Sequence, residues 1–300
     1  PDHADAPFER AAVDRWMPVD LYVGGAEHTV MHLLYSRFWY KVMYDAGLVS
    51  TPEPYRKLRH QGMILAEDGW VPADQVNVTT GRASSRAADG IDIYAEPTSA
   101  SRLLYHAPPK AEFETLPEPE TGDGKQWIGI RSGKMSKSLG NVVTPDEMVD
   151  IYGTDCLRGY QLFMAPMDGT LVWNENGLNG ILRFYNRIWD LVTGPPSGGR
   201  RPPPLDEARR EARRLIHKAV KKCTDDLEDL RFNTMVANGL METVNGLLAL
   251  WSEELAATDE GREVIEKLIL LIAPTAPLLA EELWEHTGHA GSVVLAEWPD

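Results

Sequence analysis

Apolar residues recur at strand-like spacing near the start of the chain and at helical spacing directly after it. Residues 19–25 alternate apolar and polar side chains and end in two glycines, which predicts a short strand followed by a turn. Residues 27–45 carry apolar residues four positions apart, which predicts a helix. The apolar run at 62–66 predicts a second, buried strand. Strand, helix and strand in this order favour a parallel sheet with crossover helices.

The pattern changes over residues 67–130, which are rich in glycine, proline, alanine and acidic residues. Four prolines exclude long helices from this stretch. They are Pro108, Pro109, Pro117 and Pro119. The stretch therefore predicts a small inserted module that is exposed and partly irregular.

Helical spacing dominates from residue 144 onward. Thr144 predicts an N-cap, with Pro145 at the first helical position and Glu147 completing a capping box. Further helices are predicted at 154–164, 177–192, 205–228, 232–255, 260–272 and 277–287. A linker rich in glycine and proline is predicted at 193–204. This half of the chain therefore predicts a helical bundle.

Composition is that of an ordinary soluble globular protein, and the 300 residues suggest about two domains. No apolar run approaches the roughly 20 residues that a membrane helix needs. Cys156 and Cys223 are far apart and lie in predicted helices, which favours neither a disulfide framework nor a zinc site. We therefore expect a reducing, cytoplasmic setting.

The overall charge and one local cluster point in opposite directions on nucleic-acid binding. The formal net charge is −15, whereas phosphate binding requires lysine and arginine. Residues 200–222 nevertheless hold nine basic and three acidic side chains, which suits a polyanionic partner. The same cluster suits a solvated helix face with internal ion pairs, so both interpretations stay open.

Two lysines lie three positions apart in the run Lys-Met-Ser-Lys-Ser at residues 134–138. Ammonium groups on a loop of small and hydroxyl-bearing residues suit a triphosphate, whose charge must be held while one phosphorus is attacked. That chemistry requires no acid–base group. The alternative is a solvent-exposed basic turn without a ligand.

This run, with Gly140-Asn141 behind it, resembles the second signature of the class I aminoacyl-tRNA synthetases. Residues 19–28, Val-Asp-Leu-Tyr-Val-Gly-Gly-Ala-Glu-His, together with residues 32–38, resemble the catalytic core of the leucyl-tRNA synthetase family. Segments similar to the same family recur at 61–65, 152–166, 183–189, 232–234 and 274–284. Apart from residues 67–130, the resemblance covers nearly the whole chain.

The resemblance implies an α/β Rossmann-type fold, the second half of a class I catalytic domain, followed by an all-α helical bundle. The catalytic half is expected at 1–66 and 131–172, the inserted module at 67–130, and a tRNA-binding bundle, similar to an anticodon-binding domain, at 173–300. The implied activity is that of a leucine–tRNA ligase, monomeric in its full-length form. It would use ATP, with Mg²⁺ on the phosphates, to activate leucine and transfer it to leucine tRNA. Isoleucyl, valyl or methionyl synthetases, or a non-catalytic tRNA-binding paralogue, are the alternatives.

The resemblance also implies roles for the residues of the basic run. Lys134 and Lys137 are expected to stabilise the charge on the leaving pyrophosphate. Ser136 and Ser138 are expected to donate hydrogen bonds to phosphate oxygens, and backbone groups beside Met135 to seat the adenine ring.

The remaining site residues are expected near the first strand. Met63 is expected beside the adenine, with an ordinary core residue as the alternative. Gly25 and Glu27 are expected to contact the ribose of ATP, since glycine lets a ligand approach the backbone closely. His28 and His32 lie one helical turn apart and are expected to line the leucine pocket, with core histidines as the alternative. No further ligands accompany this pair, so no metal site is predicted.

The basic cluster gains a role because the family contacts tRNA in this region. The expected contact residues are Arg209, Arg213, Lys218, Lys221 and Lys222. Trp173 and Trp189 are instead expected to fill the core of the bundle.

The chain departs from the family in one signature. In the family, a His-x-Gly-His motif in the first half of the Rossmann domain supplies the other side of the phosphate clamp. The run of this form in the present sequence, residues 286–289, lies at the end of the last predicted helix, outside the expected catalytic half. The family's editing domain, expected ahead of residue 1, and its small C-terminal module are also missing. We therefore expect a C-terminal fragment of a longer synthetase that does not activate leucine by itself.

Overall fold

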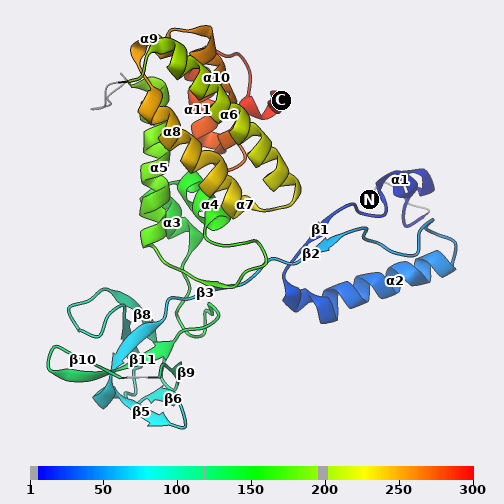
Figure 1. Cartoon of the computed structure of the whole chain (residues 1–300). Helices are drawn as coiled ribbons and strands as arrows, with labels where there is room; N and C mark the ends of the chain where they lie inside the picture. Colours follow the sequence, from blue (N-terminus) through cyan, green and yellow to red (C-terminus); the bar gives the residue numbers. More distant parts are fainter. Residues whose placement is uncertain (1–5, 118, 195–201) are drawn as a thin grey trace. The chain divides into compact units, whose positions relative to one another are not determined.

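The computed structural model describes residues 6–117, 119–194 and 202–300, and the chain divides into two compact units (Figure 1). Unit 1 comprises Pro1–Met63 with Met167–Thr170, and unit 2 comprises Ile64–Pro166 with Leu171–Asp300. Each unit is therefore built from two separate stretches of the sequence.

Unit 1 is a short parallel β-α-β arrangement. Its elements are α1 (Arg10–Trp16), β1 (Tyr22–Val23), a 3₁₀ turn (Ala26–His28), a π-helical turn (Thr29–Leu33), α2 (Leu34–Asp45) and β2 (Leu58–Arg59). Strand β1 pairs in parallel with β2, with Tyr22 opposite Leu58, and α2 lies in the connection between them. The predicted helix and the parallel pairing are confirmed. The strand after the helix, however, lies at 58–59, and the run predicted at 62–66 contributes a different strand to unit 2.

Helix α2 exposes the apolar stripe by which the sequence predicts it. Tyr40 is the residue that it buries, and the Tyr40 hydroxyl hydrogen-bonds to the Thr51 hydroxyl at 2.9 Å. Eight large apolar residues of this helix and of the turn before it are between 40% and 78% exposed: Val30, Met31, Leu34, Tyr35, Phe38, Trp39, Val42 and Tyr44. An apolar surface of this extent marks an interaction site.

An eight-stranded antiparallel sheet occupies the stretch that the sequence predicts to be partly irregular. Its strands are β4 (Gly69–Pro72), β5 (Val76–Thr79), β6 (Arg82–Ser85), β7 (Ile91–Tyr94), β8 (Leu103–Ala107), β9 (Glu112–Thr115), β10 (Glu120–Gly122) and β11 (Lys125–Arg131). They follow the order β5-β6-β9-β11-β4-β7-β8, with β10 paired to β11. The prolines that exclude helices lie in the connections after β8 and β9, where they leave these short strands intact. We call this sheet the β module.

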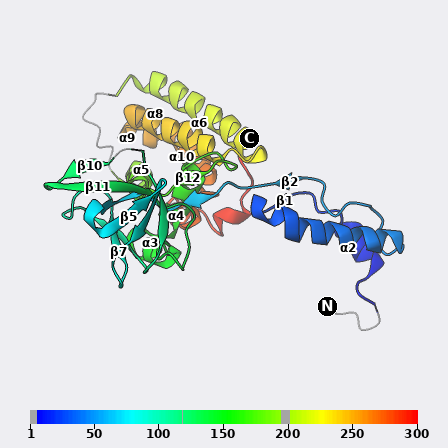
Figure 2. The same cartoon turned by 90° about the horizontal axis from the view of Figure 1, so that it is seen from below.

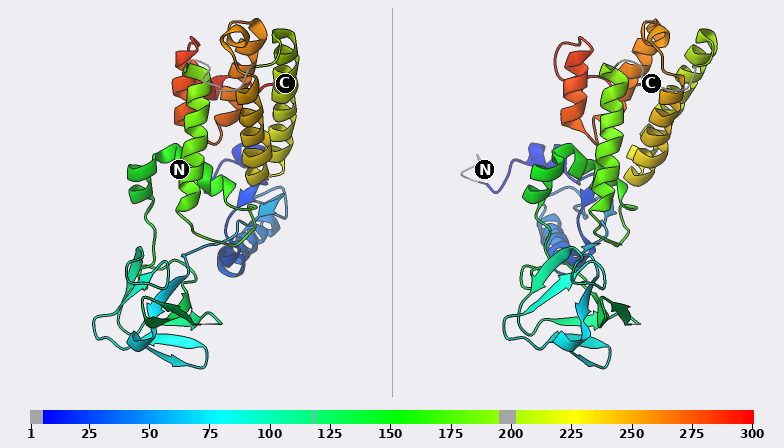
Figure 3. Two further views of the ribbon diagram at one scale, coloured as in Figure 1. Left: turned by 60° about the vertical axis from the view of Figure 1, so that its left-hand side comes forward. Right: turned by 90° about the vertical axis from the view of Figure 1, so that its left-hand side faces the viewer.

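The remainder of unit 2 is predominantly helical. Strand β3 (Ile64–Leu65) pairs in parallel with β12 (Leu171–Val172). The helices are α3 (Pro145–Tyr152), α4 (Thr154–Phe163), α5 (Asn176–Thr193), α6 (Leu205–Glu228), α7 (Phe232–Thr234), α8 (Glu242–Leu250), α9 (Glu253–Ala256), α10 (Asp259–Ile272) and α11 (Pro277–His286). Helix α6 lies beside α8 and α10 (Figure 2 and Figure 3). One apolar core joins α3 to α11, and no described helix is long and apolar enough to cross a membrane.

Two predicted helix details are wrong. Thr144 is the N-cap residue of α3 and Pro145 its first residue, as predicted, but the Thr144 side chain makes no capping hydrogen bond, so the predicted capping box is wrong. The helix predicted at 232–255 is interrupted by a π-helical segment at Met235–Met241 and ends at Leu250, where the chain becomes extended. The linker predicted at 193–204 lies largely outside the described residues.

Of the two tryptophans predicted to fill the core, one is buried and the other is exposed. Trp173 is buried, as predicted, but Trp189 is 42% exposed and does not fill the core. Both cysteines are free and buried in helices. Burial raises the pKa of Cys156 to about 11 and that of Cys223 to about 12, so both thiols stay protonated at neutral pH.

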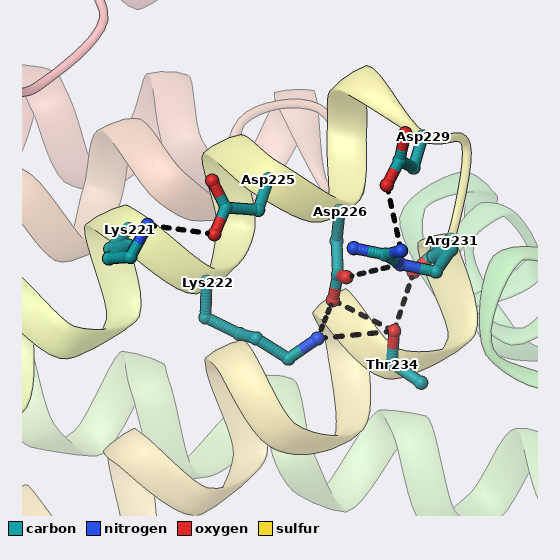
Figure 4. Close-up of polar contacts among 7 residues, drawn as sticks. All are labelled: Lys221, Lys222, Asp225, Asp226, Asp229, Arg231 and Thr234. Carbon is teal, nitrogen blue, oxygen red and sulfur yellow. Dashed lines mark hydrogen bonds and ion pairs between the residues drawn. The ribbon is translucent and has the colours of Figure 1, made fainter.

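Asp226, near the end of α6, is a fully buried carboxylate held by three donors (Figure 4). The Lys222 ammonium donates to it, the Thr234 hydroxyl donates at 2.8 Å and the Arg231 Nε donates at 2.9 Å. Burial raises the pKa of Asp226, but the three hydrogen bonds outweigh this effect and hold the pKa below its ordinary value of 3.8. The cluster fastens the turn between α6 and α7, where Leu230 has a φ of +58°.

Asp226→Asn is expected to lower the free energy of unfolding by about 2–4 kcal/mol near neutral pH, because Lys222 and Arg231 lose their counter-charge. The folded-state pKa of Asp226 is lowered, so its contribution is present above the unfolded pKa and is lost as the pH falls through the folded pKa. Below about pH 4 the native chain should therefore lose stability more steeply than the variant. Urea unfolding across this pH range measures both effects.

Asp225→Asn is the matched control, since Asp225 is half-exposed and pairs with the exposed Lys221. Its loss should cost about 0.5 kcal/mol or less. Equal stability of the two variants would contradict the role assigned to Asp226.

Candidate active site

Residues 132–141 lie in the connection between β11 and α3 and carry both lysines of the basic run; we call them the lysine loop. Gly133 and Gly140 flank its centre with φ values of +64° and +72°, a conformation that favours glycine. Lys134 forms an antiparallel bridge with Leu65 of β3. The Ala66 N–H donates to the Gly133 carbonyl at 2.8 Å. The start of the loop is thus attached to the strand that begins unit 2.

The side-chain amide of Asn141 holds the two ends of the loop together. Only 4% of Asn141 is exposed. Its Oδ1 accepts a hydrogen bond from the Ser136 N–H at 2.7 Å. Its Nδ2 donates to the carbonyls of Ser132 at 3.1 Å and Lys134 at 3.4 Å. One buried amide therefore satisfies three backbone groups that the irregular loop would otherwise leave without partners.

Both lysines of the loop are exposed, and neither forms an ion pair with another described residue. Between them, the hydroxyls of Ser136 and Ser138 lie 2.7 Å apart. The carbonyl of Ser136 accepts from the N–H groups of Leu139 and Gly140, each at 3.1 Å, which closes the turn. Two ammonium groups without counter-charges on a held loop suit a polyanionic ligand such as a triphosphate.

The Met135 side chain serves packing. It lies against the helical core and borders a hollow of about 100 Å³ together with Ile64, Met148 and Leu157. The backbone beside Met135 is therefore the part of this residue left for a ligand. Met63, the other residue expected beside adenine, is half-buried and ends the first stretch of unit 1.

Unit 1 contains a cavity of about 450 Å³ between the end of β1, the turns after it and the end of β2. It is lined by Tyr22, Val23, Gly24, Gly25, His28, His32, Leu33, Leu58, Arg59, His60 and Gln61. The four residues expected at the ribose and in the leucine pocket therefore meet at one place, with Glu27 folded against Gly25 at its edge.

Tyr22 orients the histidines of this cavity. Its hydroxyl hydrogen-bonds to His32 Nε2 at 2.7 Å, and its ring stacks on Tyr55 at a centroid distance of 4.2 Å. The rings of His28 and His32 meet edge to face at 6.3 Å. Burial, followed by the neighbouring Tyr55, raises the pKa of Tyr22, so its hydroxyl stays protonated and can donate to the imidazole.

Gly25 and Glu27 are in close contact. A Cβ atom added to Gly25 would lie 2.2 Å from Glu27 Oε2, which no side chain could tolerate without displacing the carboxylate. Beside them, the Gly24 carbonyl is hydrogen-bonded to His60 Nδ1 at 2.9 Å. Glycine at position 25 therefore allows the carboxylate to lie directly over the backbone.

Known sequences identify this combination of a lysine loop and a histidine-lined cavity. A sequence model described as "tRNA synthetases class I (I, L, M and V)" matches residues 130–173, and one described as "Anticodon-binding domain of tRNA ligase" matches residues 209–300. The leucine–tRNA ligase 1 of Rhizobium johnstonii is 42% identical over 300 residues, and the leucine–tRNA ligase of Rhodopirellula baltica is 37% identical over 309 residues. The chain belongs to the leucine–tRNA ligase family. All of it aligns with these relatives, but it spans about 31% of the length of each.

Solved structures of the family agree with the fold. The LeuRS of Agrobacterium radiobacter, crystallised in a ternary complex with tRNA and LeuAMS, has a TM-score of 0.66 and 26% identity; the match covers 98% of this chain and 30% of that one. A Mycobacterium tuberculosis methionyl-tRNA synthetase shares the fold at a TM-score of 0.53 and 15% identity, over 92% of this chain and 45% of that one. The predicted fold class, a Rossmann-type region of a class I synthetase followed by a helical bundle, is confirmed. So is the resemblance to the leucyl enzymes.

The residues that the ligase resemblance singled out fall into two groups. Gly25, Glu27, His28 and His32 meet in unit 1, whereas residues 134–138 share one loop of unit 2. Three residues of the unit 1 site were not singled out from the sequence: Tyr22, Tyr55 and His60. They come together through the pairing of β1 with β2, and no local spacing could have shown it.

The basic residues expected to contact tRNA are mostly paired within the bundle. Arg209 pairs with Glu260 at 2.5 Å and Arg213 with Glu263 at 3.3 Å, both across to α10. Lys221 pairs with Asp225, and Lys222 with Asp226. Lys218 alone of the five has no ion-pair partner among the described residues. This pairing is the pattern that a solvated helix face with internal ion pairs would produce.

Proposed function

We propose that this chain supplies the phosphate-binding loop and the amino-acid pocket of a leucine–tRNA ligase. In the first step a leucine carboxylate oxygen attacks the α-phosphorus of ATP, the bond to the bridging oxygen breaks and pyrophosphate leaves. In the second step a hydroxyl of the terminal adenosine of leucine tRNA attacks the leucyl carbonyl carbon, and AMP leaves. The observation that carries this proposal is the pair Lys134 and Lys137, held on an anchored loop without counter-charges among the described residues.

The two lysines would act by electrostatic stabilisation. Negative charge builds on the β- and γ-phosphates as the bond to the α-phosphorus breaks, and positioned ammonium groups stabilise it more in the transition state than in bound ATP. Because Asn141 already orders the loop, little conformational entropy remains to be lost when ATP binds. The hydroxyls of Ser136 and Ser138 would donate to the same phosphate oxygens.

The cavity of unit 1 would hold the amino acid and the ribose. Its size, about 450 Å³, is sufficient for a leucyl group and a sugar. His28 and His32, with His32 oriented by Tyr22, would border the leucine side chain. Glu27 would accept hydrogen bonds from the ribose hydroxyls, and Gly25 would let the sugar approach the backbone.

We assign Mg²⁺ to the phosphates of ATP. Among the described residues, no group of three or more His, Cys, Asp or Glu side chains could hold a metal ion. The ion would arrive with the nucleotide and screen its phosphate charge. Leucine tRNA is assigned to the helical bundle, supported by the anticodon-binding match and by the tRNA in the related ternary complex. Lys218 is the predicted contact residue with a free ammonium group.

The proposed site is one side of a larger clamp. The exposed apolar stripe on α2 supports this, as do the absence of a His-x-Gly-His spacing from the expected catalytic half, residues 1–66 and 131–172, and the greater length of the relatives. We assign that stripe to contact with the remainder of the ligase. A non-catalytic tRNA-binding paralogue is the weaker alternative, because a module that only binds tRNA gains little from keeping Lys134 and Lys137.

Replacing either lysine is expected to slow leucine activation by the complete ligase. Lys134→Ala and Lys137→Ala should each lower kcat for leucine-dependent ATP–pyrophosphate exchange about 100-fold, because each removes one stabilising charge from the transition state. The KM for leucine should stay unchanged. Lys125→Ala, an exposed lysine of β11, is the control and should leave the rate intact. Full exchange activity in both loop variants would contradict the proposal.

Gly25→Ala is expected to weaken ATP binding, because its Cβ would lie 2.2 Å from the Glu27 carboxylate and displace it. The KM for ATP in the exchange assay should rise about tenfold, the typical loss of one hydrogen bond to a charged group. Gly180→Ala, on α5 of unit 2, is the control, since a Cβ there also meets no atom within 4 Å. An equal KM for ATP in the two variants would show that Glu27 does not bind the ribose.

A further inference from the structure

One strand of the β module contacts both ends of the lysine loop. The Tyr105 hydroxyl, on β8, lies 2.8 Å from the Ser132 hydroxyl at the start of the loop. At the other end, Gly140 lies against the next residue of β8, and a Cβ added there would be 2.9 Å from the His106 carbonyl oxygen. Leu139 packs against the core of the β module. The β module therefore contacts the lysine loop in the folded chain as well as preceding it in the sequence.

Ser132 is the point where these contacts converge. It is 3% exposed, and all its polar groups are engaged. Its N–H donates to Asp68 Oδ1 at 2.9 Å, its carbonyl accepts from Asn141 and its hydroxyl is bonded to Tyr105. Lys134 follows two residues later. A shift at Ser132 would therefore carry the backbone of Lys134 with it.

The contribution of the Tyr105 hydroxyl can be tested separately from the packing of its ring. The ring belongs to the core of the β module, with 9% of the residue exposed. Burial raises the pKa of Tyr105, so the hydroxyl stays protonated at neutral pH and keeps its hydrogen bond. Phenylalanine would preserve the packing and remove this one polar contact.

We propose that Tyr105 is a positioning residue which, through Ser132, sets the place of Lys134 and Lys137 for phosphate binding. The inserted β module thereby acts on the lysine loop. The inference rests on the proposed function only for its catalytic consequence, because the contact itself is structural. The leucine pocket is lined entirely by residues of unit 1, so loss of the contact should affect kcat and leave the KM for leucine unchanged.

Amide hydrogen exchange on the 300-residue chain tests the positioning. Tyr105→Phe should accelerate exchange at the Ser136 and Gly140 amides about tenfold, the effect of one lost hydrogen bond on local opening. Tyr94→Phe is the matched control: Tyr94 lies on the neighbouring strand β7, its ring contacts Trp127, and its hydroxyl forms no hydrogen bond with the described residues of the loop. The control should leave loop exchange at the native rate.

The double variant Tyr105→Phe with Ser132→Ala separates positioning from simple stability. Removing both hydroxyls leaves no buried hydroxyl unpaired, so the stability lost in the single variants should largely return. Loop exchange should nevertheless stay fast, because the tie to β8 is still missing. Native exchange rates in Tyr105→Phe, or recovery of loop protection together with stability in the double variant, would overturn the proposal.

The complete ligase supplies the catalytic readout. Tyr105→Phe should lower kcat for leucine-dependent ATP–pyrophosphate exchange about tenfold at constant KM for leucine. Faster amide exchange with an unchanged kcat would overturn the claim that Tyr105 positions the lysines. If the native ligase shows no leucine-dependent exchange at all, the proposed function fails, while the amide-exchange result still decides the contact.

Discussion

The buried side-chain amide of Asn141 is the interaction on which the candidate site depends. Two glycines with positive φ would otherwise leave the lysine loop with many accessible conformations. The amide joins the Ser132 and Lys134 carbonyls to the Ser136 N–H, and so orders the segment that carries both ammonium groups. Around it, Met135 is anchored in the helical core and Leu139 in the core of the β module. The charged groups stay in solvent while the backbone that carries them is packed on both sides.

Unit 1 shows the opposite balance, since it presents apolar side chains to solvent and places the two histidines in a cavity. The pairing of Tyr22 with Leu58 brings the end of β1 beside the end of β2, and the cavity forms where both strands stop. This is the edge at which parallel α/β sheets bind ligands. Helix α2 keeps Tyr40 inside and leaves its apolar stripe exposed, so burial within this chain accounts for little of its stability. A synthetase about three times as long as this chain has ample polypeptide to cover that stripe.

Local sequence patterns predicted the elements, and they failed where the fold depends on distant contacts. The helix predicted at 205–228 matches α6 at both ends, because its periodicity is long and uninterrupted. The β module was missed as a regular sheet because its strands are short. Its prolines, which exclude long helices, lie in the connections between the strands. Residues 134–138 could be proposed from the sequence because the candidate residues form one compact motif. Contacts such as Tyr105 with Ser132, or Arg209 with Glu260 in another helix, join residues with no periodic relation, so only the folded chain reveals them.

Leucine-dependent ATP–pyrophosphate exchange tests most directly whether this chain holds one side of a two-sided phosphate clamp. The purified 300-residue chain should show no exchange above background. Exchange should appear when the remaining part of the ligase is supplied as a second polypeptide, and it should depend on Lys134 and Lys137. Robust exchange by the chain alone would show that Lys134, Lys137 and the unit 1 cavity suffice for activation, and would contradict this account of the site.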